Sequence, residues 1–167
     1  MNIFVLDESP VTSAQMMNDK HVVKMPTESM QMMSTILTYH EQPAPFLPVM
    51  LNHPCTIWAR ESRQNFQWLR EHAQALCEEF TVRYNKQHKV EWILDTFTDT
   101  WAKMENEILP DDGLTPFAIA ISDHMNCRQI DGFDEMSAVD KYRQYYIHDK
   151  AHIADWKTSK PEWYGDE

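Results

Sequence analysis

Glycine is scarce in this 167-residue sequence, where it occurs only three times. β-Sandwiches and small barrels join many short strands through tight turns, and those turns favour residues that accept a positive φ. The scarcity of glycine therefore disfavours such folds and favours helices. The sequence also lacks any run of eighteen or more apolar residues, so no membrane-spanning helix is expected.

Two further features are missing from the chain. The N-terminal stretch "MNIFVLDESP" lacks the basic start and the long apolar core of a signal peptide, which predicts a cytoplasmic location. The three cysteines, Cys55, Cys77 and Cys127, are odd in number and widely spaced, so neither a disulfide framework nor a CxxC metal site is indicated.

Basic residues are fewer than acidic ones: the sequence has 15 lysines and arginines and 26 aspartates and glutamates, which gives a formal net charge of -11. Such a chain repels phosphate backbones, so a broad DNA-binding face is disfavoured. The acids gather at residues 91–112, at 131–140 and at the C-terminus. The N-terminal half therefore has room for one local basic cleft, with Lys20, Lys24, Arg60, Arg63 and Arg70 as its cations.

The apolar residues follow a helical period over much of the chain, which predicts an all-α fold with one domain over residues 1–167. We expect a compact bundle of about four to five helices with long, proline-bearing loops. Ser9 and Pro10 are typical of a helix start, and Pro26 predicts either a kink in one long helix or a junction of two.

The other expected elements follow in order. Four prolines make residues 40–56 an ordered loop. Helices are expected over residues 58–86, with Trp58 and Leu69 inward, over 90–109, with Trp92 and Trp101 inward, and over 134–158. Residues 114–136 are expected to be mostly irregular, with at most one short element.

The stretch "NDKHVVKMPTES", residues 18–29, concentrates reactive side chains on one helix face. Lys20, Lys24, Glu28 and Gln31 share that face, and His21 lies beside it. A lysine amine can attack a carbonyl or a sugar C1′, and a glutamate one turn away can move the required protons. The alternative is an exposed strip of salt bridges, although the many nearby methionines indicate an enclosed helix.

Two other segments are candidates for substrate binding. "LNHPCTIWARESRQNFQWL" places Asn52 and His53 on a loop and Arg60 and Arg63 on a helix rich in aromatics. Arginines beside aromatics can hold phosphates and stack a base, but they can equally pair with acids beside a core. Trp163 in the terminal "KPEWY" is either a stacking platform or part of a docked tail.

Metal-binding patterns are weak. No HExxH occurs, and His148 with His152 is the only pair with suitable spacing on one expected helix, which is more often a plain surface pair. We therefore expect no metal and no cofactor.

Taken in order, these segments resemble the phage-type pyrimidine-dimer DNA glycosylases, the endonuclease V group. The resemblance rests on the short apolar start, the proline-bearing first helix, "NHP", "EEFTVRYNKQHKV" and the terminal "KPEWY", and it covers roughly the first 90 residues and the last ten. It implies a small all-α bundle that cuts the glycosidic bond through an imine formed by the mature N-terminal amine, helped by a glutamate on the first helix. It also implies a DNA or nucleotide substrate whose target is turned out of its stack.

Our leading hypothesis is a phage-type enzyme acting on a pyrimidine base or nucleotide. Asn2 is large for the usual removal of an initiator methionine, so Lys24 or Lys20 is the expected nucleophile or phosphate clamp, and Glu28 is the expected acid/base. The remaining expected site residues are His21 and Gln31 in the cleft floor, with Asn52, His53, Arg60, Arg63 and Trp163 positioning the substrate.

Two alternatives remain open. The same fold could act on modified nucleotides or on hypermodified phage DNA, for which the acidic charge is no obstacle. The protein could instead be a non-enzymatic DNA mimic whose acidic face binds a host factor. No membrane partner is expected in any of the three cases.

Overall fold

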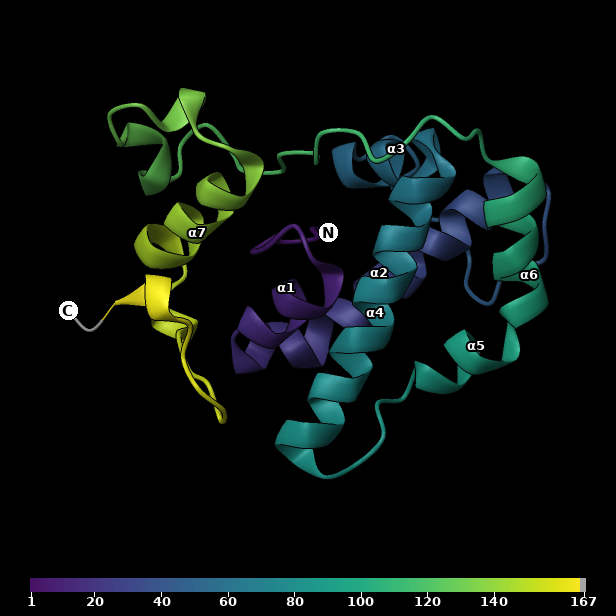
Figure 1. Ribbon diagram of the computed structural model, residues 1–167, viewed down its shortest axis with the longest axis horizontal. Helices are drawn as coiled ribbons and strands as arrows, with labels where there is room; N and C mark the ends of the chain where they lie inside the picture. Colours follow the sequence, from purple (N-terminus) through teal and green to yellow (C-terminus); the bar gives the residue numbers. More distant parts are fainter. Residues whose placement is uncertain (166–167) are drawn as a thin grey trace.

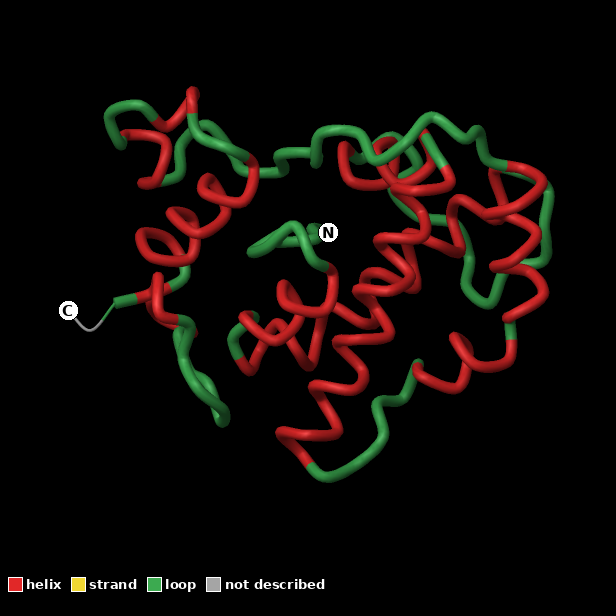
Figure 2. The backbone as a smooth tube through the Cα atoms, in the orientation of Figure 1, coloured by secondary structure: helices red, strands yellow, loops and turns green. Residues whose placement is uncertain are grey.

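The computed structural model describes residues 1–165, and within that range every regular element is a helix (Figures 1 and 2). The all-α prediction is therefore confirmed. The α-helices are α1 (Pro10–Met16), α2 (Asp19–Tyr39), α3 (Pro54–Glu61), α4 (Arg63–Tyr84), α5 (Glu91–Thr96), α6 (Thr98–Lys103) and α7 (Ala138–Asp149). They outnumber the four to five expected because several predicted helices are interrupted.

The first interruption separates α1 from α2. Ser9 caps α1 and Pro10 opens it, as predicted, but α1 ends at Met16, and the Asn18 side chain caps α2 by accepting from the His21 amide at 2.9 Å. Pro26 lies inside α2. The alternative that two helices meet at Pro26 is therefore wrong, and the junction falls eight residues earlier.

Arg83 on α4 explains where this junction falls. Its fully buried guanidinium donates to the carbonyl oxygens of Gln15 at 3.0 Å and Met17 at 2.7 Å, and it forms ion pairs with Asp19 and Glu79. Carbonyl groups at a helix C-terminus lack partners within their own helix. Arg83 supplies such partners at the end of α1, so a residue far along the chain fixes this corner.

The second predicted helix is divided at Ser62. This residue has an extended backbone, its hydroxyl donates to the Gly113 carbonyl at 2.7 Å, and its oxygen accepts the Asn65 amide, which caps α4. Trp58 and Leu69 are buried on either side of the break, as predicted. A contact with the later chain therefore turns one expected helix into two.

The helix predicted over residues 90–109 is divided into α5, α6 and a π-helix, η1 (Met104–Ile108). Trp101 is buried as predicted, but the prediction for Trp92 is wrong, because this side chain is 56% exposed. Residues 114–136 carry two short 3-10 helices, η2 (Asn126–Gln129) and η3 (Phe133–Glu135), rather than at most one.

The C-terminal region is less helical than predicted. α7 is followed by the 3-10 helices η4 (Ala151–Ile153) and η5 (Glu162–Tyr164). Residues 40–53 form the predicted proline-rich loop, but α3 begins at Pro54, so the expected end of the loop at residue 56 is wrong. The Thr35 hydroxyl holds the loop, because it donates to the Val49 carbonyl and accepts the Val49 amide, both at 2.9 Å. No helix in the described range is long and apolar enough to cross a membrane.

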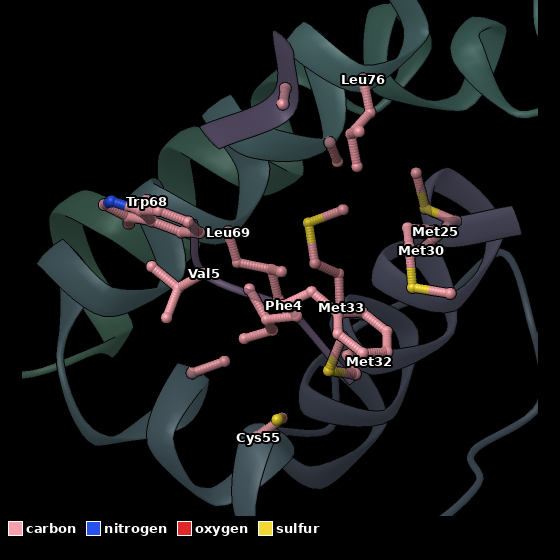
Figure 3. Packing of buried hydrophobic residues seen from close by; sticks show 14 of the residues in the cluster. Phe4, Val5, Met25, Met30, Met32, Met33, Cys55, Trp68, Leu69 and Leu76 are labelled. Carbon is pink, nitrogen blue, oxygen red and sulfur yellow. The ribbon is translucent and has the colours of Figure 1, made fainter. Parts of the chain in front are cut away.

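Methionines of α2 dominate the core. Figure 3 shows Met25, Met30, Met32 and Met33 in one buried cluster with Leu69 of α4 and with Phe4 and Val5 of the N-terminal segment. The apolar pattern predicted the burial of this helix. The three cysteines are buried and free as well. Burial raises the pKa of each free thiol to about 12.

The N-terminal segment runs through the interior, between α7 and the α2–α4 pair (Figure 1). Residues 2–6 are buried although they form no helix. The Asn2 side-chain amide donates to the Ala120 carbonyl at 2.9 Å, and the Arg143 guanidinium of α7 donates to the Leu6 carbonyl, also at 2.9 Å. These contacts hold the start of the chain in the middle of the molecule.

Candidate active site

A polar pocket of about 240 Å³ opens where the N-terminal segment, α2 and the end of α7 meet. Three of the four expected catalytic residues, His21, Lys24 and Glu28, line it. The other lining residues are Met1, Asn2, Phe4, Met25, Ala120, Tyr145 and Lys150. We refer to this cavity as the Glu28 pocket.

Glu28 lies between two amines. One carboxylate oxygen, Oε2, is 3.8 Å from the Met1 amino nitrogen and accepts the Asn2 amide at 3.2 Å, while Oε1 is 3.2 Å from Lys24 Nζ. The Glu28 side chain is 13% exposed, and that of Lys24 is 68% exposed. The carboxylate is therefore enclosed, and Lys24 extends from it toward solvent.

Asn2 and Phe4 fix the position of the Met1 amine. The Asn2 side-chain oxygen accepts the amides of Ile3 at 2.8 Å and Phe4 at 3.2 Å. Phe4 has a φ of +52°, which is uncommon for a large side chain and costs free energy. This conformation places the Phe4 ring in a stack on His21, with ring centroids 4.1 Å apart.

His21 is a buried, neutral histidine in the pocket wall. Its Nδ1 lies 2.5 Å from the hydroxyl oxygen of Tyr146 on α7. Burial lowers the pKa of His21 to about 3, with smaller contributions from the positive charges of Lys150 and Lys24. At neutral pH the ring therefore carries no charge and can offer hydrogen bonds without adding to the cations around it.

α7 and the residue that follows it supply the opposite wall. Lys150, the C-cap of α7, places Nζ 4.9 Å from the Tyr145 ring centroid and 5.9 Å from that of Phe4. With the Met1 amine and Lys24, the pocket holds three cationic groups and one carboxylate. It is therefore locally positive within a chain of net charge -11.

His53 lies in a second depression, of about 460 Å³, which shares Ala120 with the Glu28 pocket. Its Nδ1 accepts the Cys55 amide at 3.1 Å and caps α3, so the remaining proton of the neutral ring is on Nε2. Burial and the charge of the Met1 amine lower the pKa of His53, and Glu28 partly opposes this shift. His53 is thus electrically coupled to both groups.

Two residues expected in the cleft floor lie elsewhere. Lys20 is exposed on α2 and does not line the Glu28 pocket. Gln31 lines a separate, more apolar groove of about 380 Å³ beside Phe46 and Trp92. Helix spacing puts both residues on the same side of α2 as Glu28, but the pocket formed by the N-terminal segment and α7 encloses only part of that face.

The arginines expected to hold phosphate contact loop carbonyls instead. Arg60 donates to the Leu51 carbonyl at 2.5 Å and lies 4.7 Å from the Tyr39 ring centroid. Arg63 donates to the Leu109 carbonyl at 3.3 Å. Both side chains therefore brace irregular segments.

Asn52 and Trp163 also lie outside the Glu28 pocket. Asn52 is exposed in a turn. The Trp163 indole donates to Met16 Sδ at 3.3 Å and lies 6.1 Å, centroid to centroid, from the Tyr146 ring. Trp163 thus belongs to a docked segment, which is one of the two interpretations considered from the sequence.

Sequence reasoning missed Phe4, Tyr145 and Lys150. Phe4 had the appearance of an ordinary apolar residue, and only its backbone conformation distinguishes it. Tyr145 and Lys150 are more than 110 residues from Glu28, and no local pattern links them to α2. Their contribution depends on how α7 packs against the N-terminal segment.

No group of three or more potential metal ligands occurs among residues 1–165. Of the histidine pair considered above, His148 Nε2 lies 3.2 Å from the Gln144 side-chain oxygen and His152 is exposed on η4.

Fold and site together define a class: small all-helical proteins in which a glutamate on a long helix faces the α-amine of the chain in a polar, locally positive pocket. Residues 1–92 match the family described as pyrimidine dimer DNA glycosylase. This match covers more than half of the chain, so the protein belongs to that family. No curated protein and no solved structure matches the sequence.

Proposed function

We propose that this protein cleaves the glycosidic bond of a pyrimidine nucleotide in DNA, with the Met1 amine as nucleophile and Glu28 as the acid/base. Family membership supports DNA as the substrate. The observation that carries the proposal is the 3.8 Å separation between the Met1 amino nitrogen and Glu28 Oε2 inside the pocket. At this separation, the carboxylate of Glu28 can accept a proton from the amine that acts as the nucleophile.

Lys24 is the competing nucleophile, since its Nζ is also within reach of Glu28. In general, α-amines are less basic than lysine amines by roughly two to three pH units, so a larger fraction is unprotonated near neutral pH. Lys24 is also mostly exposed, whereas attack on a sugar carbon needs a fixed, enclosed amine. We therefore assign Lys24 to holding a phosphate, with Lys20 extending that contact along α2.

The role of Glu28 does not depend on whether Met1 is retained in the mature protein. The Asn2 nitrogen is 3.2 Å from Glu28 Oε2 and would become the free amine if Met1 were removed. The same carboxylate would then serve the new N-terminus.

The proposed reaction begins when the amine attacks C1′ as the bond from C1′ to the base breaks, so the base leaves with the bonding electron pair. Glu28 takes a proton from the amine and returns it to the ring oxygen of the sugar. The sugar ring opens, and a C=N bond forms between C1′ and the amine. His53, in the neighbouring depression, is electrostatically coupled to the amine and to Glu28, and as a neutral imidazole it is a candidate for proton relay.

Borohydride trapping tests this assignment. Reduction of the imine links enzyme to DNA covalently, so we expect an adduct with duplexes that carry a pyrimidine dimer or an abasic site. Peptide mass spectrometry should place the adduct on the N-terminal residue. Chain extension before Met1 should abolish it, whereas the same tag after Glu167 should not.

Lys20→Ala combined with Lys24→Ala is the matched control. We expect this double variant to retain the adduct but to bind DNA more weakly. An adduct mapped to Lys24, or one that survives N-terminal extension and disappears in the double variant, would contradict the assignment to Met1.

The second candidate is the alternative that acts on modified nucleotides or on DNA with modified pyrimidines. The small pocket and the net charge of -11 favour it, because a free nucleotide needs no extended basic surface. Binding of nucleotides and of oligonucleotides should be compared at two salt concentrations. Only binding to a polymer should weaken steeply as salt rises.

A further inference from the structure

We propose that Tyr146 holds His21 in the tautomer that carries its proton on Nε2, so that His21 donates a hydrogen bond to the carbonyl oxygen of the departing pyrimidine. The donor role rests on the proposed function. The tautomer does not, because it follows from the contacts of the two side chains.

The first step concerns the Tyr146 hydroxyl, which is fully buried. Burial raises the pKa of this phenol, and the backbone of Asn18 only partly opposes the shift, so the hydroxyl keeps its proton at neutral pH. A buried hydroxyl proton needs an acceptor inside the protein. Among the described residues, His21 Nδ1, at 2.5 Å, is the acceptor within reach.

The second step concerns the imidazole ring. If Nδ1 carried the proton, it would donate to the phenol and leave the buried hydroxyl proton of Tyr146 without an acceptor. Leaving a buried donor unpaired is unfavourable, because the group loses its hydrogen bond to water without gaining another. The neutral ring therefore accepts at Nδ1, and its proton is on Nε2.

The third step concerns what Nε2 faces. This atom has no hydrogen-bond partner within residues 1–165, and it is not among the side-chain atoms that are sealed from solvent there without a partner. His21 lines the Glu28 pocket, where Lys24 and Lys150 supply the charges on either side. The N–H bond is therefore available to a ligand in the pocket.

The fourth step concerns the chemistry. When the glycosidic bond breaks, the base leaves with an electron pair, and negative charge develops on the pyrimidine carbonyl oxygen. A fixed N–H donor aimed at a developing oxyanion stabilises the transition state more than the ground state. Tyr146 is thus a positioning residue, which acts through His21, and Phe4 holds the ring by stacking on it.

Nitrogen-15 spectroscopy of histidine-labelled protein tests the tautomer without any substrate. Long-range proton–nitrogen correlations at pH 7 should show His21 protonated at Nε2, with the resonance assigned by its absence from His21→Gln. In Tyr146→Phe, the Nδ1 resonance should move downfield because it loses its donor. The matched control is Tyr142→Phe, whose hydroxyl contacts Ala118 and Ala120 rather than His21.

A wild-type spectrum with the proton on Nδ1 would overturn the inference, and so would an unchanged Nδ1 resonance in Tyr146→Phe. If that variant does not fold, the wild-type spectrum still decides the tautomer.

Kinetics test the donor role separately. His21→Leu should lower kcat about tenfold or more with a smaller change in KM, whereas His21→Gln, which retains an N–H group, should recover part of the loss. Equal kcat values for both variants and the wild type would overturn the donor role while leaving the N-terminal nucleophile intact. Absence of any trapped adduct would count against the proposed function, and the spectra would still decide the tautomer.

Discussion

The family-matched residues 1–92 and the remaining described residues, 93–165, contribute differently to the pocket. The first region supplies the Met1 amine from the irregular N-terminal segment, and it supplies Glu28 and His21 from the long helix α2. The second is built from short helices and irregular segments, and it supplies walls and charge through Ala120, Tyr145 and Lys150. In the proposed reaction, the first region therefore carries the reacting groups, whereas the second region completes the walls of the pocket.

Replacing Glu28 should have the largest effect on activity. Glu28→Gln preserves the shape of the side chain and an acceptor for the Asn2 amide, but it removes the acid/base group. We expect the rate of base release under single-turnover conditions to fall by about 10²–10⁴-fold. Glu71→Gln, on the exposed side of α4, is the matched control and should retain the wild-type rate.

Replacing Arg83 should have the largest effect on stability. Arg83→Met leaves Asp19 and Glu79 in largely buried positions without their cation, which typically costs about 3–5 kcal/mol. Urea unfolding gives this value directly. Arg70→Met, which breaks the more exposed pair with Glu105, should cost about 1 kcal/mol or less. Similar losses in the two variants would show that the α1–α2 corner does not depend on Arg83.

Replacing His72 tests whether a residue of the first region also makes the protein less stable in acid. Burial lowers the pKa of this fully enclosed histidine to about 3, and neither ring nitrogen has a partner within the described chain. Below about pH 6.5 this histidine takes up a proton in the unfolded state but not in the folded state. The free energy of unfolding therefore has its full value above that pH and decreases as the pH falls toward 3. At pH 4.5 the loss from this group alone is ~2–3 kcal/mol.

His72→Phe preserves the ring that stacks on Trp68 but cannot take up a proton. We expect the unfolding free energy of this variant to fall less steeply than that of the wild type between pH 6.5 and 4.5. The remaining acid dependence should include His21, whose pKa is lowered in the same direction. Parallel pH profiles for variant and wild type would show that His72 is not buried in its neutral form.

Replacing Lys150, in the second region, should have the smallest effect of these substitutions. Lys150→Gln should weaken DNA binding several-fold, and it should reduce the dependence of log affinity on log salt by about one unit, as expected for one lost phosphate contact. Lys157→Gln, at an exposed residue beyond the pocket, is the matched control. An unchanged salt dependence in Lys150→Gln would confine phosphate binding to the first region.

The sequence predicted the elements whose information is local. Helical periodicity identified the α-helical class, the buried methionines and the shared face of Lys24 and Glu28. It could not locate the α1–α2 junction, because Arg83 stabilises that corner from more than 60 residues away. Pro26 could not decide between its two predicted outcomes, since a proline can either end a helix or remain inside one that tertiary packing supports, as it does in α2.

The candidate site was predicted only in part, for a similar reason. His21, Lys24 and Glu28 share a helix, so their spacing was informative. Arg60 was assigned to phosphate from its residue type, but one of its N–H groups donates to a loop carbonyl, and Arg60 does not line the Glu28 pocket. Lys150 lies at the site only because α7 packs on the N-terminal segment. No pattern in a single sequence shows that these two distant segments contact each other.

The buried N-terminal segment also has a consequence for folding. The Asn2 side chain donates to the Ala120 carbonyl, 118 residues later, and the Leu6 carbonyl accepts from Arg143, 137 residues later. Contacts this far apart along the chain close large loops, and the loop entropy must be lost before the contacts can form. The walls of the Glu28 pocket therefore enclose the Met1 amine only once segments more than 110 residues apart have packed together.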